Sequence, residues 1–247
     1  MKTLALVVPC HNEAKRLDMG AFIRAAEKWP WISFCLVDDG STDSTAEILA
    51  HLSNLSPSFH AIYIPENVGK AEAVKRGVEH VCSYSGADCV GFWDADLAAP
   101  LCEIPSFMRA FEENASLKAA IGSRWPHLGA DIRRSSMRGF ASAVAKAVIR
   151  RALGVPVWDT QCGAKVFTCE VAREIFRAPF RTRWLFDVEL LARIGRKSLR
   201  SDVREIPLEA WFDVPGSKVG FRAFAELLLA IPSIRRETMV EYQPCTF

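Results

Sequence analysis

The sequence predicts an α/β fold in which a mostly parallel sheet is flanked by helices. Two observations indicate this fold. Short apolar runs alternate with helical patterns through the first half of the chain, and polar residues follow directly after four of the runs. Such alternation is typical of βαβ units, in which each helix carries the chain back to begin the next parallel strand. The length of 247 residues suits one domain of this kind.

The apolar runs and the periodic segments between them define the expected elements of the first half. Strands are predicted at Leu4–Val8, Phe34–Val37, Ala61–Ile64, Cys89–Trp93 and Ala119–Ile121. Helices are predicted at Met19–Lys28, Ser44–Leu52, Lys70–Val81 and Glu103–Glu113. Ser41 or Asp43 is expected to cap the second of these helices.

The second half predicts fewer and longer elements. A helical pattern runs from Arg133 to Leu153, a further helix is expected over Phe186–Ile194, and an apolar segment covers Phe221–Ile234. With no repeat or linker in view, we expect one domain over residues 1–220 and a C-terminal helical tail over 221–247. The tail either closes the core or lies in a membrane interface, and the sequence favours neither.

Composition excludes several classes of protein. Hydrophobic residues make up 50% and the net charge is +2, which is ordinary for a globular protein and gives no support for nucleic-acid binding. The eight cysteines include no C-x-x-C pair, and they are expected to be reduced, buried thiols. Neither a signal peptide nor a run of ~20 apolar residues is found. The protein is therefore expected to be cytoplasmic, or peripheral on the cytoplasmic face of a membrane.

Polar residues gather where the predicted strands end. These are His11, Asn12 and Glu13, which follow Pro9 after the first strand, Asp38, Asp39, Ser41 and Asp43 after the second, Glu66, Asn67 and Lys70 after the third, and Asp94 and Asp96 after the fourth. Because the carboxyl ends of parallel strands meet at one edge of a sheet, we expect a shared crevice there.

Asp94 and Asp96 are the central candidates in this crevice. Carboxylates are the ligands that Mg²⁺ and Mn²⁺ prefer, and such an ion neutralises a diphosphate. An Asp-x-Asp sequence alone also occurs in solvated turns, but its place at the end of a predicted buried strand favours a metal site. As a metal ligand, Asp96 would act directly in catalysis, because the ion stabilises a departing diphosphate.

The other strand ends have two interpretations each. Asp38 and Asp39 are predicted to accept hydrogen bonds from a nucleobase or ribose, or to shape a strand-to-helix turn. Asn12 and Glu13 carry the same alternatives. Lys70, at the start of a predicted helix, would contact phosphate or be a solvated lysine.

Four motifs together resemble family 2 glycosyltransferases of the GT-A fold: Val8–Glu13, Val37–Asp43, Asn67–Lys70 and Asp94–Asp96. The resemblance implies a Rossmann-like nucleotide-diphospho-sugar transferase fold and an enzyme that takes a hexose from a nucleotide-diphosphate sugar, either UDP-glucose-like or GDP-mannose-like. It also implies that Pro9, Glu13 and Asp39 line the nucleoside site, and that Asp94 and Asp96 hold Mg²⁺ or Mn²⁺.

Motifs in the second half look like the dolichyl-phosphate β-glucosyltransferase and polyprenyl-phosphate sugar synthase branch. They are Gly122–Arg124, the basic segment from Arg133, Asp159–Gly163, Arg183–Glu189 and Pro215–Lys218. This resemblance implies hexose transfer to a lipid phosphate, usually with inversion. It places Asp159 near the reaction centre as a catalytic or sugar-positioning residue, and Gln161 near the donor. Ala98 stands where many lipid-phosphate mannosyltransferases have Gln, which removes a third protein ligand and favours a glucosyltransferase.

A lipid-phosphate acceptor needs cations beside the sugar site. Arg124, Arg133, Arg134 and Arg138 are the candidates, because arginine suits bidentate phosphate contacts. The basic segment beginning at Arg133 also fits an anionic membrane surface, although a solvated helix face would have the same composition.

Three other functions compete with lipid-phosphate transfer. The first is transfer to a hydroxyl of a glycan or glycolipid, which would need Asp159 as general base, whereas a phosphate monoester with a second pKa of ~6 is already largely ionised. A non-catalytic binding protein is disfavoured because Asp94, Asp96, Lys70 and Asp159 are all present. A sugar nucleotidyltransferase is disfavoured because no glycine-rich, lysine-bearing loop follows the first strand. The sequence gives no indication of the oligomeric state.

Overall fold

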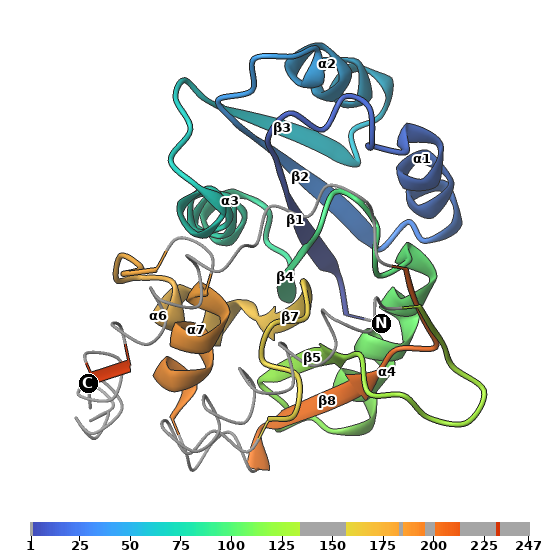
Figure 1. Cartoon of the computed structure of the whole chain (residues 1–247), viewed down its shortest axis with the longest axis vertical. Helices are drawn as coiled ribbons and strands as arrows, with labels where there is room; N and C mark the ends of the chain where they lie inside the picture. The colour runs from blue at the N-terminus through green and yellow to red at the C-terminus, as the bar shows by residue number, and fades with distance from the viewer. Residues whose placement is uncertain (1, 134–156, 183–184, 196–200, 213–230, 233–247) are drawn as a thin grey trace.

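A seven-stranded sheet forms the centre of the molecule in the computed structural model, which describes residues 2–133, 157–182, 185–195, 201–212 and 231–232 (Figure 1). The strand order is β3-β2-β1-β4-β7-β5-β8. The strands are β1 (Leu4–Cys10), β2 (Ile32–Asp39), β3 (Phe59–Ile64), β4 (Cys89–Trp93), β5 (Ala119–Ser123), β7 (Ala164–Thr168) and β8 (Val203–Pro207). A small second sheet pairs β6 (Asp131–Arg133) with β9 (Ala210–Phe212).

All strands of the large sheet except β7 run in the same direction. β1 pairs in parallel with β2 and β4, β2 with β3, and β5 with β8, whereas β7 runs antiparallel between β4 and β5. The carboxyl ends of six strands therefore meet at one edge, and β7 begins at that same edge. The predicted mostly parallel sheet is confirmed.

Helices cover both faces because alternate residues of the central strands point to opposite sides. On one face Leu4, Leu6 and Val8 of β1 share a core with α1 (Met19–Lys28), α2 (Thr45–Leu55) and α4 (Ile104–Glu113), which the short helix η1 (Leu101–Glu103) precedes. On the other face Ala5 and Val7 pack with α3 (Lys70–Tyr84), α6 (Cys169–Ile175) and α7 (Phe186–Ile194) (Figure 1). Helices packed on both faces thus bury the central strands, whose carboxyl ends lie side by side at one edge.

Most predicted elements of the first half are confirmed with small extensions. All five predicted strands and all four predicted helices are present, and α7 has the predicted bounds. The prediction that Ser41 or Asp43 caps α2 is wrong, because its N-cap is Ser44; Asp43, one residue earlier, accepts the N–H of Thr45 at 3.0 Å. Of the strands and helices described in the second half, β6, β7, α6, β8 and β9 were not predicted.

The prediction that a helix begins at Arg133 is wrong. Arg133 ends β6, where it pairs with Phe212 of β9. Helical periodicity is a local signal, whereas this strand is fixed by a partner far along the chain. The rest of the predicted basic helix, with Arg134 and Arg138, lies outside the described residues, as does nearly all of the predicted tail.

The helices built from described residues include none with the length and apolar character that crossing a bilayer requires.

Candidate active site at the carboxyl edge of the sheet

The loops after β1 and β2 are fastened to each other by Asn12. This residue has a left-handed backbone with φ 54°, which asparagine tolerates better than most residues. Its Oδ1 accepts the N–H groups of Thr42 at 2.8 Å and Asp43 at 3.3 Å, and its own N–H donates to Ser41 Oγ at 3.0 Å. Asn12 therefore shapes the crevice, whatever it also contacts there.

Asp39 connects the end of β2 to the loop before α3. Its Oδ1 accepts the N–H of Val68 at 2.7 Å and its Oδ2 that of Gly69 at 2.9 Å. Gly40 follows with φ +61°, and a Cβ there would lie 2.5 Å from the backbone nitrogen of Asn67. Only glycine permits this approach, so the second and third strand ends form one packed surface.

Asp38, Pro9 and Glu13 lie on the same surface. Asp38 is buried and its Oδ1 accepts the N–H of Ser41 at 3.2 Å. Pro9 lies opposite Val37 in the β1–β2 register. The predicted nucleoside residues are thus brought together, while their role toward a nucleoside stays a prediction.

Arg16 is a site residue that the sequence analysis missed. Its Nε donates to Glu13 Oε2 at 2.8 Å, and its second terminal nitrogen contacts Oε1. Burial acts to lower the pKa of Arg16, but Glu13, followed by Asp96 and Asp94, outweighs it and the pKa is raised. Arg16 thus adds positive charge beside the two candidate metal ligands.

Asp94 and Asp96 follow β4 as predicted, and their surroundings differ. Asp94 forms an ion pair with Lys70 Nζ, and its backbone N–H donates to the carbonyl of Gly163 at 3.1 Å. Asp96 accepts the N–H of Ala98 at 3.1 Å. Burial and then the charge of Asp94 raise the pKa of Asp96, because two neighbouring carboxylates repel each other when both are ionised. A bound cation would relieve this repulsion.

This pair fits a divalent cation that is shared with a ligand. In the part of the chain that the structure describes, no third His, Cys, Asp or Glu completes a metal cluster with other such residues. Mg²⁺ is often held by one or two carboxylates together with substrate phosphates and waters. Asp94 and Asp96 would hold the ion, and a diphosphate would complete its coordination.

Lys70 is the first residue of α3 and points to the site. Burial acts to lower its pKa, but the charges of Asp94 and then Asp187 outweigh this effect, and the pKa is raised. Lys70 is therefore a permanent cation at the amino end of a helix, where the helix dipole also attracts anions.

Asp159 and Arg124 form a buried, two-pronged ion pair. Arg124 Nε and its terminal nitrogen lie 2.6 and 2.7 Å from the two carboxylate oxygens of Asp159, which is only 1% exposed. Glu205 of β8 accepts the Asp159 N–H at 2.9 Å. Arg124, predicted to hold acceptor phosphate, thus contacts the residue predicted to be catalytic, and Gln161 lies half-buried in the turn that follows.

Residues 5–176, more than half of the chain, match the sequence profile of glycosyl transferase family 2. The chain belongs to this family. It is 31% identical over 241 residues to a dolichyl-phosphate beta-glucosyltransferase of Trichomonas vaginalis, covering 92% of this chain and 69% of that protein. It is 31% identical over 258 residues to the dolichyl-phosphate beta-glucosyltransferase of Saccharomyces cerevisiae, covering 94% and 71%.

Solved structures show that this family 2 glycosyltransferase has the GT-A fold. Glucosyl-3-phosphoglycerate synthase from Mycobacterium tuberculosis, in complex with UDP, superposes with a TM-score of 0.69 at 17% identity, covering 95% of this chain and 80% of that chain. A second complex of that enzyme contains Mn²⁺, UDP-glucose and phosphoglyceric acid, and superposes with a TM-score of 0.67 at 17% identity, covering 94% and 80%. The predicted family, fold and enzyme class are confirmed.

The glycosyltransferase also contains a buried lysine that the sequence analysis did not single out. Lys165 of β7 is 0% exposed, and its Nζ donates to Asp187 Oδ1 and to the Cys162 carbonyl, both at 2.6 Å. The ammonium lies 5.4 Å from the centre of the Phe92 ring. A lysine inside an apolar strand segment was the available signal, since a buried charge requires a partner.

Lys165 fixes the loop that carries Asp159, Gln161 and Gly163. It binds the carbonyl of Cys162, next to Gly163, whose backbone contacts Asp94. Glu189, two residues after Asp187, instead accepts the N–H groups of Arg181 and Thr182 at 3.0 and 2.8 Å. Asp187 therefore fixes Lys165, and Glu189 fixes the segment that precedes α7.

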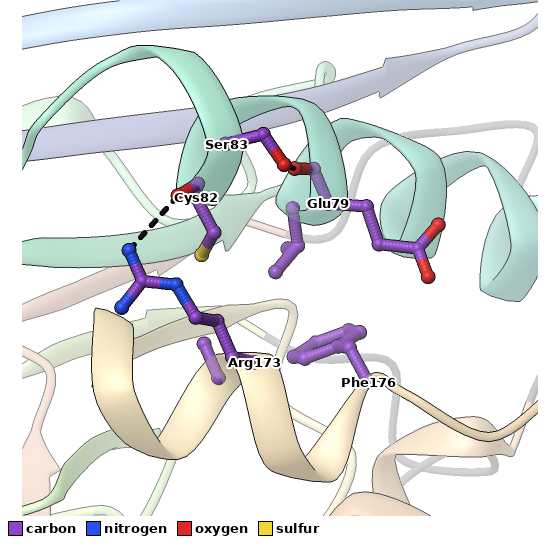
Figure 2. Close-up of a pocket in the computed structure, with 7 residues that line it drawn as sticks. Glu79, Cys82, Ser83, Arg173 and Phe176 are labelled. Atoms are coloured by element: carbon purple, nitrogen blue, oxygen red, sulfur yellow. Dashed lines mark hydrogen bonds between the residues drawn. The ribbon is translucent and has the colours of Figure 1, made fainter.

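A groove between α3 and α6 lies away from these catalytic candidates (Figure 2). It is lined by Val78, Glu79, Cys82, Ser83, Ala172, Arg173 and Phe176. These residues belong to the later turns of α3 and to the helix after the far end of β7, whereas Lys70 begins α3 at the other end. The groove contains none of the predicted site residues.

Proposed function

We propose that this glycosyltransferase transfers glucose from UDP-glucose to a polyprenyl or dolichyl phosphate, with inversion and with the help of Mg²⁺ or Mn²⁺. The single observation that most favours a phosphate acceptor is the Arg124–Asp159 pair. Asp159 is the acid that a hydroxyl acceptor would need as its base, and both of its oxygens are held by a guanidinium. The names of the relatives support the same acceptor and sugar.

The donor would lie across the carboxyl edge of the sheet. Its nucleoside would face Pro9, Asn12, Glu13, Asp38 and Asp39. Asp94 and Asp96 would hold the divalent ion, which supplies charge stabilisation for the leaving diphosphate. Lys70 would contact the phosphates, to which a permanent cation at a helix start is suited.

The acceptor phosphate would attack without a general base. Its second pKa of ~6 leaves it largely ionised near neutrality. A phosphate oxygen forms a bond to the anomeric carbon, and the bond from that carbon to the donor phosphate oxygen breaks with its electron pair going to UDP. No proton transfer is needed, so positioning and charge neutralisation supply the acceleration.

Cations and apolar side chains near Asp159 suit a lipid phosphate. Arg124 lies beside it, and Arg133, Arg134 and Arg138 remain proposed contacts to the acceptor. Trp125 and Trp158 flank the ion pair in sequence, their ring centroids are 4.8 Å apart, and each is about half exposed. Tryptophan suits surfaces where apolar and polar groups meet. The tail over residues 221–247 is a proposed peripheral contact with the same membrane.

Transfer assays with the full chain test this proposal. Purified protein is mixed with Mn²⁺, short polyprenyl phosphates and radiolabelled UDP-glucose, with GDP-mannose as the competing donor. We expect an organic-extractable glucolipid from UDP-glucose that Asp96→Ala does not form. No lipid-linked product with either donor would eliminate the proposal.

The variant Asp159→Asn separates a phosphate acceptor from a hydroxyl acceptor. If Asp159 positions Arg124, turnover falls but its pH profile keeps its shape. If Asp159 is a general base for a hydroxyl, turnover is nearly abolished at every pH. Thermal-shift measurements with UDP- and GDP-sugars rank the donors independently, because ligands that bind the folded state raise its apparent stability.

A further inference from the structure

The carboxylate of Asp94 is enclosed from two directions. Its Oδ2 lies closest to Gly163, where a Cβ would come within 2.0 Å of that oxygen. Its Oδ1 contacts Lys70 Nζ. The backbone N–H of Asp94 is held by the Gly163 carbonyl at 3.1 Å, which fixes the residue against the loop. Lys70 therefore contacts the carboxylate oxygen that lies farther from Gly163.

The fold fixes the position of Lys70 beside Asp94. It is the first residue of α3, and the left-handed Gly69 before it donates its N–H to Asp39 at 2.9 Å. The side chains of Lys70 and Asp94 are only 20% and 29% exposed. An ion pair this well shielded from water is stronger than a surface pair.

Two cations cannot share one carboxylate oxygen without strong repulsion. A divalent ion on Asp94 would lie within a few ångströms of the Lys70 ammonium, unless the lysine moved away. The long side chain of lysine permits such a movement, and a diphosphate would offer it new oxygens to contact.

We propose that Lys70 is the resident counter-ion of Asp94, that a divalent cation must displace it, and that the donor diphosphate takes up the displaced ammonium. Metal and donor then bind cooperatively. The donor diphosphate stabilises the displaced ammonium, which makes metal binding to Asp94 easier, and the metal frees the ammonium to contact the diphosphate. The metal would bind weakly before the donor arrives. This inference rests on the proposed function, since it assumes that the metal binds Asp94.

Manganese affinity measured without turnover tests this inference. The concentration of free Mn²⁺ is followed by electron paramagnetic resonance as the full chain is titrated, with and without UDP. We expect Lys70→Met to bind Mn²⁺ about tenfold more tightly than the wild type when UDP is absent. We also expect UDP to strengthen Mn²⁺ binding less in this variant. Lys70→Arg keeps the charge and should keep the weak metal binding.

Lys75→Met is the matched control, because Lys75 lies on the same helix and pairs with Glu79. Its Mn²⁺ affinity should equal that of the wild type. Circular dichroism confirms folding, and Lys70→Gln replaces the methionine variant if that one does not fold. Unchanged or weaker Mn²⁺ binding in a folded, uncharged Lys70 variant would overturn the inference. If instead Asp94→Asn binds Mn²⁺ as the wild type does, the proposed metal site itself is wrong.

Discussion

Arg124 grips both carboxylate oxygens of Asp159, and its backbone N–H adds a third contact to Oδ2 at 3.0 Å. The pair joins the end of β5 to the loop before β7. Arg124 also lies with its guanidinium carbon 4.8 Å from the centre of the Trp211 ring. Arg124 and Asp159 belong to different motifs and were predicted to have different roles, yet they form one structural unit. A substitution of either residue should therefore disturb the position of the other.

The first prediction concerns the stability of this unit. Arg124→Met should lower the free energy of unfolding by about 3–5 kcal/mol, because it leaves the buried Asp159 charge without its partner. Denaturant unfolding measures the loss. Adding Asp159→Leu should recover part of it, because the double variant buries no unpaired charge.

An exposed ion pair provides the control for this experiment. Arg204 and Glu113 also form an arginine–carboxylate contact at 2.6 Å, but about half of each side chain is exposed. Arg204→Met should therefore cost only about 0–1 kcal/mol. Equal losses in Arg124→Met and Arg204→Met would show that burial of the Asp159 pair is not what stabilises it.

The strand ends could be predicted from sequence because parallel strands bring them together by topology alone. Asp39, Asp94 and Lys70 needed no tertiary information to be placed at one edge, since Asp39 and Asp94 lie at the end of recognisable apolar runs and Lys70 follows another after a short loop. The pairing of Arg124 with Asp159 could not be found this way. It depends on β7 entering the sheet in reverse between β4 and β5, which no local pattern announces.

Elements fixed by distant partners were also the ones that sequence reasoning missed. β6 is three residues long and exists through its pairing with β9, so periodicity around Arg133 predicted a helix. Lys165 and Asp187 lie on different elements whose contact is visible only after folding. Local sequence patterns predict where strands and helices begin and end, whereas the pairing of Lys165 with Asp187 depends on which side chains the fold buries together.

The second prediction tests the Lys165–Asp187 pair. Lys165→Met leaves the Asp187 carboxylate and the Cys162 carbonyl without a buried donor, and should cost about 3–5 kcal/mol of unfolding free energy. The double variant with Asp187→Leu should be more stable than the single variant. Lys118→Met is the control, because the Lys118 side chain is 46% exposed beside Asp202. A Lys165→Met protein as stable as the Lys118→Met protein would contradict the prediction.

The third prediction concerns Gly163. An alanine methyl there would lie 2.0 Å from Asp94 Oδ2 and force the carboxylate to move. Gly163→Ala should weaken Mn²⁺ binding in the presence of UDP by about 10–100-fold, the usual effect of disturbing the support of a metal ligand. Titration of free Mn²⁺ measures this change.

Gly77→Ala separates the local effect of Gly163→Ala from a general loss of stability. Its Cβ would lie 2.4 Å from Val7 Cγ1 inside the core. This variant should lose about 1–3 kcal/mol of stability by overpacking, yet keep its Mn²⁺ affinity when folded. If Gly163→Ala binds Mn²⁺ as tightly as Gly77→Ala, the contact with Asp94 does not shape the metal site.

The fourth prediction concerns the reactivity of Cys82 in the groove between α3 and α6 (Figure 2). Hydrogen bonding with Cys169 lowers the pKa of the Cys82 thiol, burial acts in the opposite sense, and the nearby Arg173 guanidinium lowers the pKa further. Cys102 is exposed, contrary to the expectation that the cysteines are buried; partial burial of its thiol, followed by the charge of Glu103, raises its pKa. Burial raises the pKa of Cys35 to about 12. The thiolate is the reactive form, so these cysteines should respond differently to pH.

Alkylation with iodoacetamide between pH 7 and pH 9 measures that response. The rate at Cys82 should rise less over this range than the rate at Cys102, because a thiol with a lowered pKa is already more ionised at pH 7. Cys35 should stay unmodified. Fragment-resolved mass spectrometry separates the sites, and Arg173→Gln should make the pH dependence at Cys82 steeper while leaving Cys102 unchanged. A steeper rise at Cys82 than at Cys102 in the wild type would show that burial, and not Cys169 and Arg173, governs this thiol.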